Sequence, residues 1–87
     1  MKKITMFHFA GCPYCRKAER FISELEKENP LYKEIEIERI DEKLNPEIAE
    51  EYDYWYVPTF YIAGKKESEG DITKDGMRKV LDKALSL

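Results

Sequence analysis

The sequence predicts an α/β domain in which a four-stranded mixed sheet carries helices on both faces, in the order β-α-β-α-β-β-α. Three observations lead to this class. Short apolar or alternating segments typical of strands occur four times, apolar residues recur at three- and four-residue spacing in segments typical of helices, and the two kinds intermix along the chain. Short connections and right-handed crossovers then give the mixed sheet with helices on both faces, and the apolar residues on both faces of the first strand predict that it is central. The 87 residues suffice for one such domain, spanning residues 1–87.

The first half of the chain is expected to form a strand, a long helix and a second strand. Residues 3–9 carry apolar side chains on both faces, as in a strand that is covered from above and below. The helix begins at Pro13, and it ends near Asn29 because a residue that precedes proline is steered out of the α region. Residues 32–40 alternate between apolar and glutamate side chains, which predicts a strand with one exposed face at the edge of the sheet.

The second half is expected to form a short helix, a hairpin and a final helix. Asn45 is suited to cap a helix with Pro46 in its first position, running to about residue 52. Residues 59–63 are apolar and predict a buried strand, followed by a turn at residues 64–66 and an antiparallel partner strand at residues 67–70. Thr73 then caps the last helix, whose apolar residues repeat at helical spacing.

Charge and hydropathy argue against several classes of partner. The 15 basic and 18 acidic side chains leave a net charge of −3 with no basic stripe, which argues against nucleic acid or an anionic membrane as a partner. No apolar run has the length of a membrane span, and the start of the chain lacks the pattern of a signal peptide. These observations predict a cytoplasmic location. Structural disulfides are rare there, so the two cysteines are expected to be catalytic, redox-active or metal-binding.

The two cysteines, Cys12 and Cys15, stand where the first strand gives way to the first helix. A sulfur on Cys12 would face the unpaired N–H groups and the positive end of that helix, which favour the thiolate over the thiol. Cys15 lies one turn later on the apolar side of the helix, which predicts burial. We therefore expect Cys12 to attack a substrate disulfide and Cys15 to resolve the mixed disulfide.

Other uses of the cysteine pair stay open at this point. A CxxC spacing also occurs in half of a metal site, and it can arise by chance. A four-ligand zinc site within one chain is disfavoured because the sequence has two cysteines and one histidine. That histidine, His8, lies inside the first strand and is expected to be structural rather than a catalytic base.

Two short motifs carry a resemblance to a known family. The tetrapeptide CPYC at residues 12–15 resembles the active site of dithiol glutaredoxins, and VPT at residues 57–59 resembles the segment where the thioredoxin superfamily carries a cis-proline beside the redox pair. The resemblance implies a thioredoxin-like fold, thiol-disulfide oxidoreductase activity and a cis peptide bond before Pro58. It also implies that the backbone of Val57 pairs with the substrate's backbone.

The same resemblance assigns the site residues and the partners. It makes Cys12 and Cys15 catalytic and places these residues at the substrate: Pro13, Tyr14, Val57, Pro58 and Thr59. No bound cofactor or metal is expected, and the protein is expected to be a monomer. Its substrates would be disulfide-containing proteins or glutathione mixed disulfides. Either glutathione or a reductase would supply the electrons. The alternative is a metal or iron-sulfur carrier in which two chains each lend Cys12 and glutathione supplies the other sulfurs.

The sequence departs from both branches of the superfamily. Phe9 stands where dithiol glutaredoxins usually have a glutathione-binding lysine, and only Gly70 and a shifted Asp71 match their segment before the last helix. Residues 39–66 resemble the middle of thioredoxins instead, yet Gly11 and Met6 stand where thioredoxins have a tryptophan and a buried acid. The chain therefore resembles a small hybrid of the two.

Four aromatic residues precede Pro58 and have two possible roles. They are expected either to line the substrate groove beside Tyr14 or to cover the small core, and the sequence favours neither role over the other. The four residues are Tyr52, Tyr54, Trp55 and Tyr56.

Overall fold

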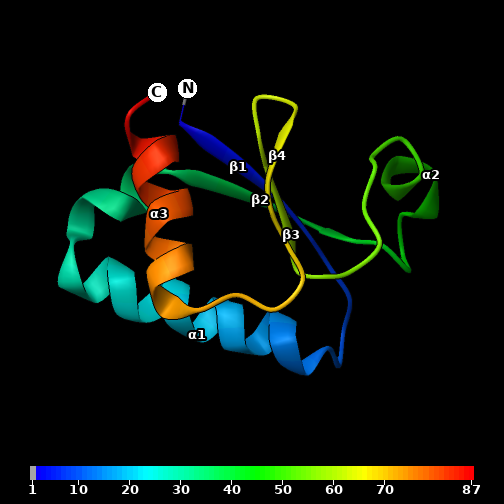
Figure 1. The fold of residues 1–87 in the computed structure, drawn as a ribbon, viewed down its shortest axis with the longest axis horizontal. Helices are drawn as coiled ribbons and strands as arrows, with labels where there is room; N and C mark the ends of the chain where they lie inside the picture. Colours follow the sequence, from blue (N-terminus) through cyan, green and yellow to red (C-terminus); the bar gives the residue numbers. More distant parts are fainter. Residues whose placement is uncertain (1) are drawn as a thin grey trace.

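The computed structural model describes residues 2–87, so the first residue of the expected domain lies outside the described part (Figure 1). The elements along the chain are β1 (Lys3–His8), α1 (Pro13–Glu28), a 3-10 helix η1 (Pro30–Glu34), β2 (Glu36–Asp41), α2 (Pro46–Ala49), β3 (Thr59–Ile62), β4 (Lys65–Glu69) and α3 (Lys74–Leu85). No helix within residues 2–87 has both the length and the apolar character needed to span a membrane.

The four strands form one mixed sheet in the order β2-β1-β3-β4. β1 is parallel to β2 and antiparallel to β3, and β3 is antiparallel to β4. The prediction of a four-stranded mixed sheet with the first strand at its centre is thus confirmed. β2 lies at an edge, as its exposed glutamates indicated, and Glu38 on it forms an ion pair with Lys3 of β1 at 3.1 Å.

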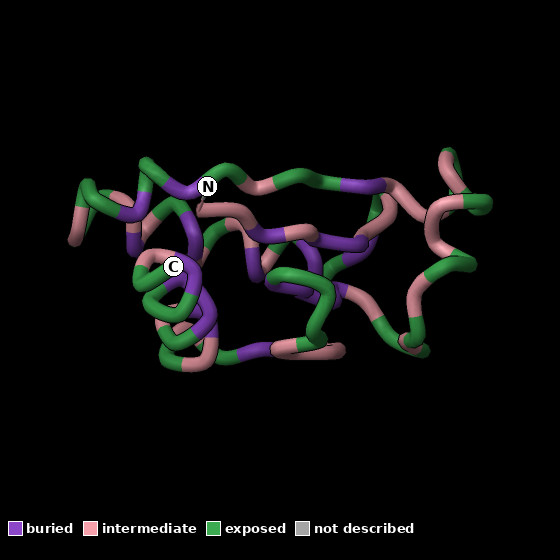
Figure 2. The backbone as a smooth tube through the Cα atoms, turned by 90° about the horizontal axis from the view of Figure 1, so that it is seen from above, coloured by how far each residue is buried: buried purple, intermediate pink, exposed green. Residues whose placement is uncertain are grey.

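Each face of the sheet has its own apolar cluster. α1 and α3 pack against each other on one face, where the fully buried Ile4 and Met6 of β1 join them. Phe7 lies on the opposite face in a smaller cluster with Ile40 and Tyr61. Figure 2 shows the buried residues along the strands and on the inward side of α3. The helices do lie on both faces, but the second face is covered by the short α2 and by the aromatic side chains that follow it.

The start of the second predicted strand is wrong, because residues 30–34 form η1 and β2 begins only at Glu36. The side chain of Asn29 accepts a hydrogen bond from the N–H of Leu31 at 3.2 Å and opens this 3-10 helix. Its buried Tyr32 donates a hydrogen bond to Asp82 of α3 at 2.5 Å. This contact with a distant helix stabilises a local conformation that the alternating pattern does not reveal.

Two further boundaries differ from the prediction. α2 ends at Ala49 rather than near residue 52, because the ring of Tyr52 is turned onto the core beside Phe7 at a centroid distance of 4.6 Å. The hairpin turns at Ala63 and Gly64, whose φ angles of 51° and 80° suit the left-handed conformation of a two-residue turn. β4 therefore begins at Lys65, inside the predicted turn.

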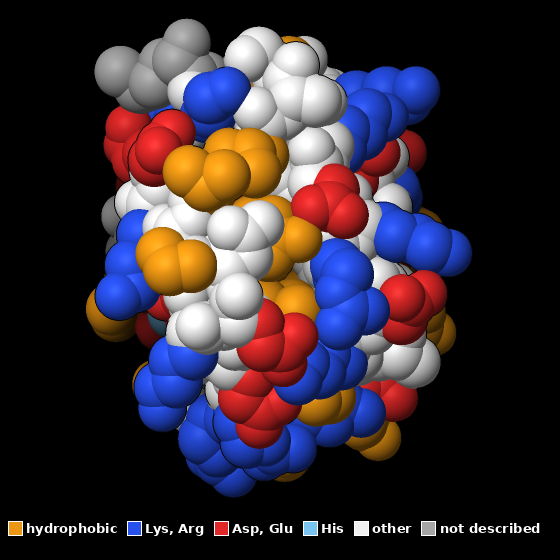
Figure 3. Space-filling view, turned by 90° about the vertical axis from the view of Figure 1, so that its left-hand side faces the viewer, with side chains coloured by type: hydrophobic (Ala, Val, Ile, Leu, Met, Phe, Trp, Pro, Cys, Tyr) orange, Lys and Arg blue, Asp and Glu red, His pale blue; other side chains and the backbone are white. Residues whose placement is uncertain are grey.

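Charges alternate in sign on the side of the molecule formed by η1, α3 and the end of α1 (Figure 3). Lys74 of α3 pairs with Glu28 of α1 at 2.5 Å, and Arg78 pairs with Asp75 at 3.0 Å. Neighbouring charges of opposite sign leave no basic stripe on this face, in line with the sequence-based argument against nucleic acid as a partner.

Candidate active site

Cys12 is the N-cap residue of α1, and Pro13 occupies the first helical position. The sulfur of Cys12 accepts a hydrogen bond from the N–H of Cys15 at 3.1 Å, and the carbonyl of Cys12 accepts the first helical bond, from Arg16, at 3.1 Å. The thiol sulfur thus takes the place that a serine or aspartate oxygen takes in an ordinary helix cap. An N–H donor and the positive end of the helix dipole both stabilise negative charge at this position.

Cys15 is buried in the apolar cluster between the sheet and α1, with an exposed fraction of 4%. Burial is the largest cause, and the hydrogen bond with Cys12 the next, of a rise in the pKa of Cys15 to about 12. The predicted burial of Cys15 is confirmed, and its sulfur is a neutral thiol at neutral pH. Cys12 is also only 3% exposed, a burial that the sequence does not predict, because its sulfur is turned inward onto the N–H of Cys15. Both cysteines are free thiols.

The segment before β3 has the geometry that the resemblance implied. The Val57–Pro58 peptide bond is cis, and the buried Pro58 accepts a hydrogen bond from the N–H of Gly70 at 2.8 Å. Val57 packs against the cluster that contains both cysteines, and the hydroxyl of the buried Thr59 donates to the carbonyl of Tyr56. The fold therefore brings Val57 to the cysteine pair from a segment more than forty residues away in the sequence.

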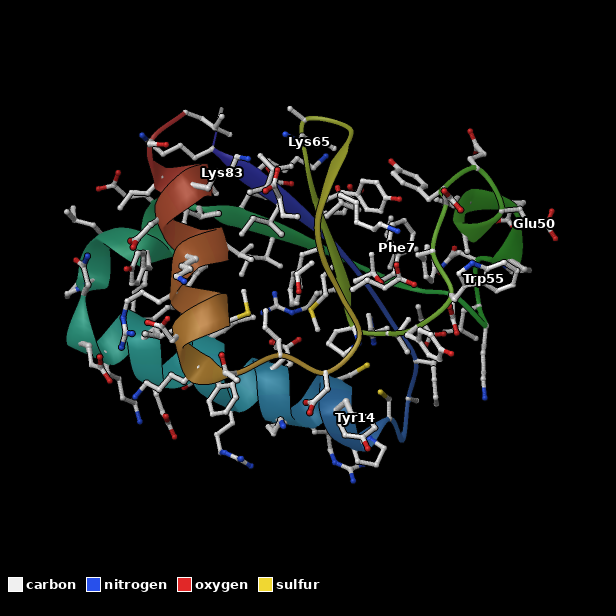
Figure 4. The ribbon with its side chains drawn as sticks, viewed as in Figure 1. Phe7, Tyr14, Glu50, Trp55, Lys65 and Lys83 are labelled. Carbon is white, nitrogen blue, oxygen red and sulfur yellow. The ribbon has the colours of Figure 1, made fainter. Side chains whose placement is uncertain are left out.

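The structure divides the four aromatic residues between the two roles that the sequence left open. Tyr52 and Tyr54 pack on Phe7, with ring centroids at 4.6 and 4.9 Å. Trp55 and Tyr56 are 86% and 71% exposed. Figure 4 shows Trp55 on the loop beside α2 and Tyr14, which is 54% exposed, at the start of α1. The first pair thus belongs to the core, and the second pair is open to a partner.

Comparison with known proteins gives a match to the family model described as Glutaredoxin over residues 4–66. The chain belongs to the glutaredoxin family. It is also 36% identical over 83 residues to the thioredoxin of Methanocaldococcus jannaschii, and the alignment covers 95% of both chains. The protein is therefore a thiol-disulfide oxidoreductase of the thioredoxin superfamily, which acts on disulfides and depends on a reductant.

Solved structures confirm that this glutaredoxin has the thioredoxin-like fold. The oxidised thioredoxin of Plasmodium falciparum gives a TM-score of 0.69 at 20% identity, with 93% of this chain and 78% of that one covered. A mutant thioredoxin from Halobacterium salinarum NRC-1 also gives 0.69 at 20% identity, with 98% and 75% covered. The sequence combines features of glutaredoxins and thioredoxins, and the comparisons agree with this, because the family model that matches is that of glutaredoxins while the similar protein from Methanocaldococcus jannaschii is a thioredoxin.

The position of the missing glutathione-binding lysine is occupied by Phe9, but a lysine lies beside it. The Nζ atom of Lys43, from the turn between β2 and α2, lies 4.3 Å from the centroid of the Phe9 ring. This is within the range of a cation-π contact. A positive charge is therefore present near this position of the glutaredoxin, supplied from another segment of the chain.

A carboxylate on β4 holds the loop that carries the exposed aromatic residues. The Oε2 atom of Glu69 accepts hydrogen bonds from the backbone N–H groups of Trp55 at 2.5 Å and Tyr56 at 3.0 Å, and Oε1 contacts Lys66 at 2.6 Å. The hydrogen bond from Lys66, followed by that from Trp55, lowers the pKa of Glu69 to about 2. Sequence reasoning missed Glu69, because nothing local to it signals partners that lie thirteen and fourteen residues earlier.

A pocket of about 510 Å³ opens beside the first turns of α1. Both cysteines line it, and so does His8. Arg16 and Arg20 also line the pocket, while Tyr14 and residues 57–59 do not. The glutaredoxin therefore presents two different surfaces around one cysteine pair.

Proposed function

We propose that the protein reduces disulfide bonds in protein substrates by two-step dithiol exchange, with Cys12 as the attacking and Cys15 as the resolving thiol. The observation that carries the proposal is the hydrogen bond from the N–H of Cys15 to the sulfur of Cys12 at the start of α1. This bond stabilises a Cys12 thiolate and orients Cys15 one turn behind it. Cys15 is buried and protonated, so it does not compete with Cys12 in the first step and acts only in the second.

The two steps balance with the electrons of the cysteine pair alone. The thiolate of Cys12 attacks one sulfur of the substrate disulfide, forms a mixed disulfide and displaces the other substrate sulfur as a thiolate. Cys15 then loses its proton and attacks the sulfur of Cys12, so that a Cys12–Cys15 disulfide forms and the second substrate thiolate leaves. Two electrons pass from the protein to the substrate, and no prosthetic group is required.

The protein substrate is assigned to the surface formed by the start of α1 and the segment before β3. Val57 lies two residues before the ladder of β3, which begins at Thr59, and we assign its peptide groups to pairing with an extended substrate segment. The exposed rings of Tyr14, Trp55 and Tyr56 offer aromatic contact area of the kind that anchors protein interfaces. The exposed Pro13 would contact the substrate beside the cysteines, and the buried Pro58 would shape the substrate site through its cis peptide bond.

Glutathione is a second candidate for the substrate and reductant, favoured by the position of Lys43. Its ammonium group lies over the ring of Phe9, where other glutaredoxins have a cation for a glutathione carboxylate. The sequence-based expectations of a monomer and of a cytoplasmic location stay predictions. The iron-sulfur carrier also stays a prediction, and within residues 2–87 no three His, Cys, Asp or Glu side chains are grouped to hold a metal ion.

Two matched serine substitutions test the assignment of the thiols. Cys12→Ser should abolish reduction of a protein disulfide, whereas Cys15→Ser should retain the first step and accumulate a mixed disulfide that mass spectrometry detects. Each variant replaces one cysteine sulfur by oxygen, so each serves as the control for the other. Disulfide reduction by the Cys12→Ser protein would refute the proposal. A brown, dimeric protein that absorbs visible light would favour the carrier instead.

The electron donor is tested with the oxidised protein. Glutathione, or thioredoxin reductase with its pyridine nucleotide, is offered to the Cys12–Cys15 disulfide, and free thiols are counted by alkylation. Faster reduction by glutathione that slows in the Lys43→Gln protein would support the glutathione candidate. Reduction by the reductase alone would restrict the function to a thioredoxin-like reduction of protein disulfides.

A further inference from the structure

A second pocket, of about 350 Å³, opens beside α2 on the face of the sheet that carries Phe7. Tyr52 and Tyr54 line this pocket, and both rings also pack on Phe7. Pro46 and Ala49 of α2 extend the apolar lining. Neither cysteine lines it, so this pocket is separate from the one beside α1.

Two carboxylates lie at the pocket beside α2 without a cation to neutralise them. Glu42 directly follows β2, and its Oε1 atom accepts a hydrogen bond from the hydroxyl of Tyr54 at 2.8 Å. Glu50 is the exposed C-cap residue of α2 (Figure 4). In the described part of the chain neither carboxylate has an ion pair. Lys43 also lines the pocket, but its ammonium group lies over the ring of Phe9 at 4.3 Å from the centroid.

The segment around this pocket carries charge of one sign. Residues 41–53 hold six of the 18 acidic side chains of the sequence but one of its 15 basic ones. None of these six acids forms an ion pair within residues 2–87, whereas Glu19, Glu38 and Glu69 elsewhere are all paired with basic side chains. Because uncompensated carboxylates of one sign add up to a negative potential, this end of the molecule attracts cations.

A lysine or arginine side chain matches the walls of the pocket beside α2. Both side chains have an apolar stem that packs on apolar surface and a charged head that stays at a polar rim. Tyrosine rings attract a cation that lies over their face, and carboxylate oxygens accept hydrogen bonds from ammonium or guanidinium groups. The stem would lie on Pro46, Ala49 and the two tyrosines, and the head would lie at Glu42 and Glu50.

The pocket beside α2 lies next to the surface that we assign to the protein substrate. Tyr54 precedes Val57 by three residues on the same loop. On the other side of the pocket, the N–H of Glu42 donates to the carbonyl of His8 at 2.8 Å, at the end of β1 from which the chain runs to Cys12. Since an extended segment advances about 3.3 Å per residue, a basic residue a few positions away from the substrate cysteine would reach the pocket.

We infer that the pocket beside α2 binds a lysine or arginine side chain of the protein substrate, so that disulfides in a basic sequence context are preferred. The inference rests on the dithiol exchange proposed above and names the class of protein that it favours. Glu42 and Glu50 determine specificity by recognising the charge of the substrate. A substrate without a basic residue is reduced by the same two steps at a lower rate.

Peptides that differ at one position test this inference. Each peptide has one cysteine, activated as a mixed disulfide with thionitrobenzoate, and the coloured thionitrobenzoate is released when Cys12 attacks the peptide sulfur. A single lysine, glutamine or glutamate is moved one position at a time along the residues on either side of the cysteine. The pre-reduced full-length protein is used in excess, and each second-order rate constant is divided by that of dithiothreitol with the same peptide, which removes differences in intrinsic reactivity.

We expect the lysine peptide to react about five- to tenfold faster than the glutamine peptide at the best position. This is the size that an exposed ion pair and a cation-π contact give together. The glutamate peptide should react more slowly than the glutamine peptide. Equal normalised rates for lysine and glutamine at every position would overturn the inference and leave dithiol exchange standing.

Variants distinguish the pocket beside α2 from a general attraction of cations. Glu42→Gln and Glu50→Gln should each lower the lysine-to-glutamine ratio, and the double variant should bring the normalised ratio close to one. Glu51→Gln is the matched control, because it removes the same charge one residue beyond Glu50 and outside the pocket. An equal fall of the ratio in the Glu51→Gln and Glu50→Gln proteins would show long-range attraction alone and would overturn the assignment to the pocket.

Failure of the proposed function gives a different result. If no peptide releases thionitrobenzoate faster than with an unreactive protein, dithiol exchange fails, and binding then decides on the pocket. The Cys12→Ser protein is titrated by calorimetry with peptides in which serine replaces the cysteine. Tighter binding of the lysine peptide than of the glutamine peptide, lost on adding Glu50→Gln, supports the site, and equal or absent binding overturns it.

Discussion

The raised pKa of Cys15 makes the second step of the reaction dependent on pH over the whole working range. With a pKa of about 12, about one Cys15 in 10⁵ is a thiolate at pH 7, whereas an ordinary cysteine with a pKa of ~8.5 would be about 3% ionised. The resolving nucleophile is thus roughly 3,000-fold scarcer than in an unburied pair. Burial, the larger cause of the shift, persists after Cys12 has entered the mixed disulfide.

The expected result is a resolving rate that rises about tenfold for each unit of pH between about pH 6 and about pH 10, because the thiolate fraction grows in that proportion below the pKa. Reduced protein is mixed with hydroxyethyl disulfide and quenched in acid, and mass spectrometry separates the mixed disulfide from the Cys12–Cys15 disulfide. The Cys15→Ser protein should hold the mixed disulfide at every pH. A resolving rate that levels off above about pH 8.5 would refute the reasoning, since an ordinary cysteine behaves in that way.

Three further predictions concern stability and the aromatic loop. The reduced protein should lose stability to urea as the pH rises above about 8.5, because Cys15 then ionises in the unfolded chain but not in the folded protein. The Cys15→Ala protein should not show this loss. If the stability of both proteins depended on pH in the same way, the assigned burial of Cys15 would be contradicted. Glu69→Ala should raise KM for a protein disulfide severalfold, because the carboxylate of Glu69 holds the loop at Trp55 and Tyr56, and it should leave kcat and the reduction of hydroxyethyl disulfide unchanged. Glu38→Gln is the control. An unchanged KM would show that this loop does not need the carboxylate of Glu69 to bind a protein substrate. Phe7→Ala should lower the free energy of unfolding by about 3–5 kcal/mol because the buried ring contacts three tyrosines, and Phe7→Leu by much less; a loss below about 1 kcal/mol in guanidinium denaturation would refute the packing.

Features that depend on local pattern were open to prediction from the sequence. The apolar side of α1, its proline in the first position and the placement of Cys12 at its start all follow from spacing within a few residues. The apolar character of β1 on both faces likewise indicated its central place in the sheet. The resemblance added the cis bond before Pro58, which no periodicity could indicate.

Features that depend on distant partners were not open to the same reasoning. The 3-10 helix η1 is tied to α3 by a hydrogen bond between Tyr32 and Asp82, fifty residues apart in the sequence. The side chain of Glu69 reaches the loop at Trp55 only after the chain has turned through the β3–β4 hairpin. The division of the four aromatic residues depends on which rings meet Phe7 across the sheet, a question of three-dimensional packing rather than of composition.

The loop held by Glu69 gives the protein a built-in optical reporter. Trp55 is the single tryptophan of the sequence, and the residue is 86% exposed while its backbone N–H donates a hydrogen bond to Glu69 of β4. Its fluorescence in the free protein is therefore that of a water-exposed indole on a fixed backbone. A partner that covers the ring shifts the emission to shorter wavelength, so docking can be titrated in solution without attaching a dye.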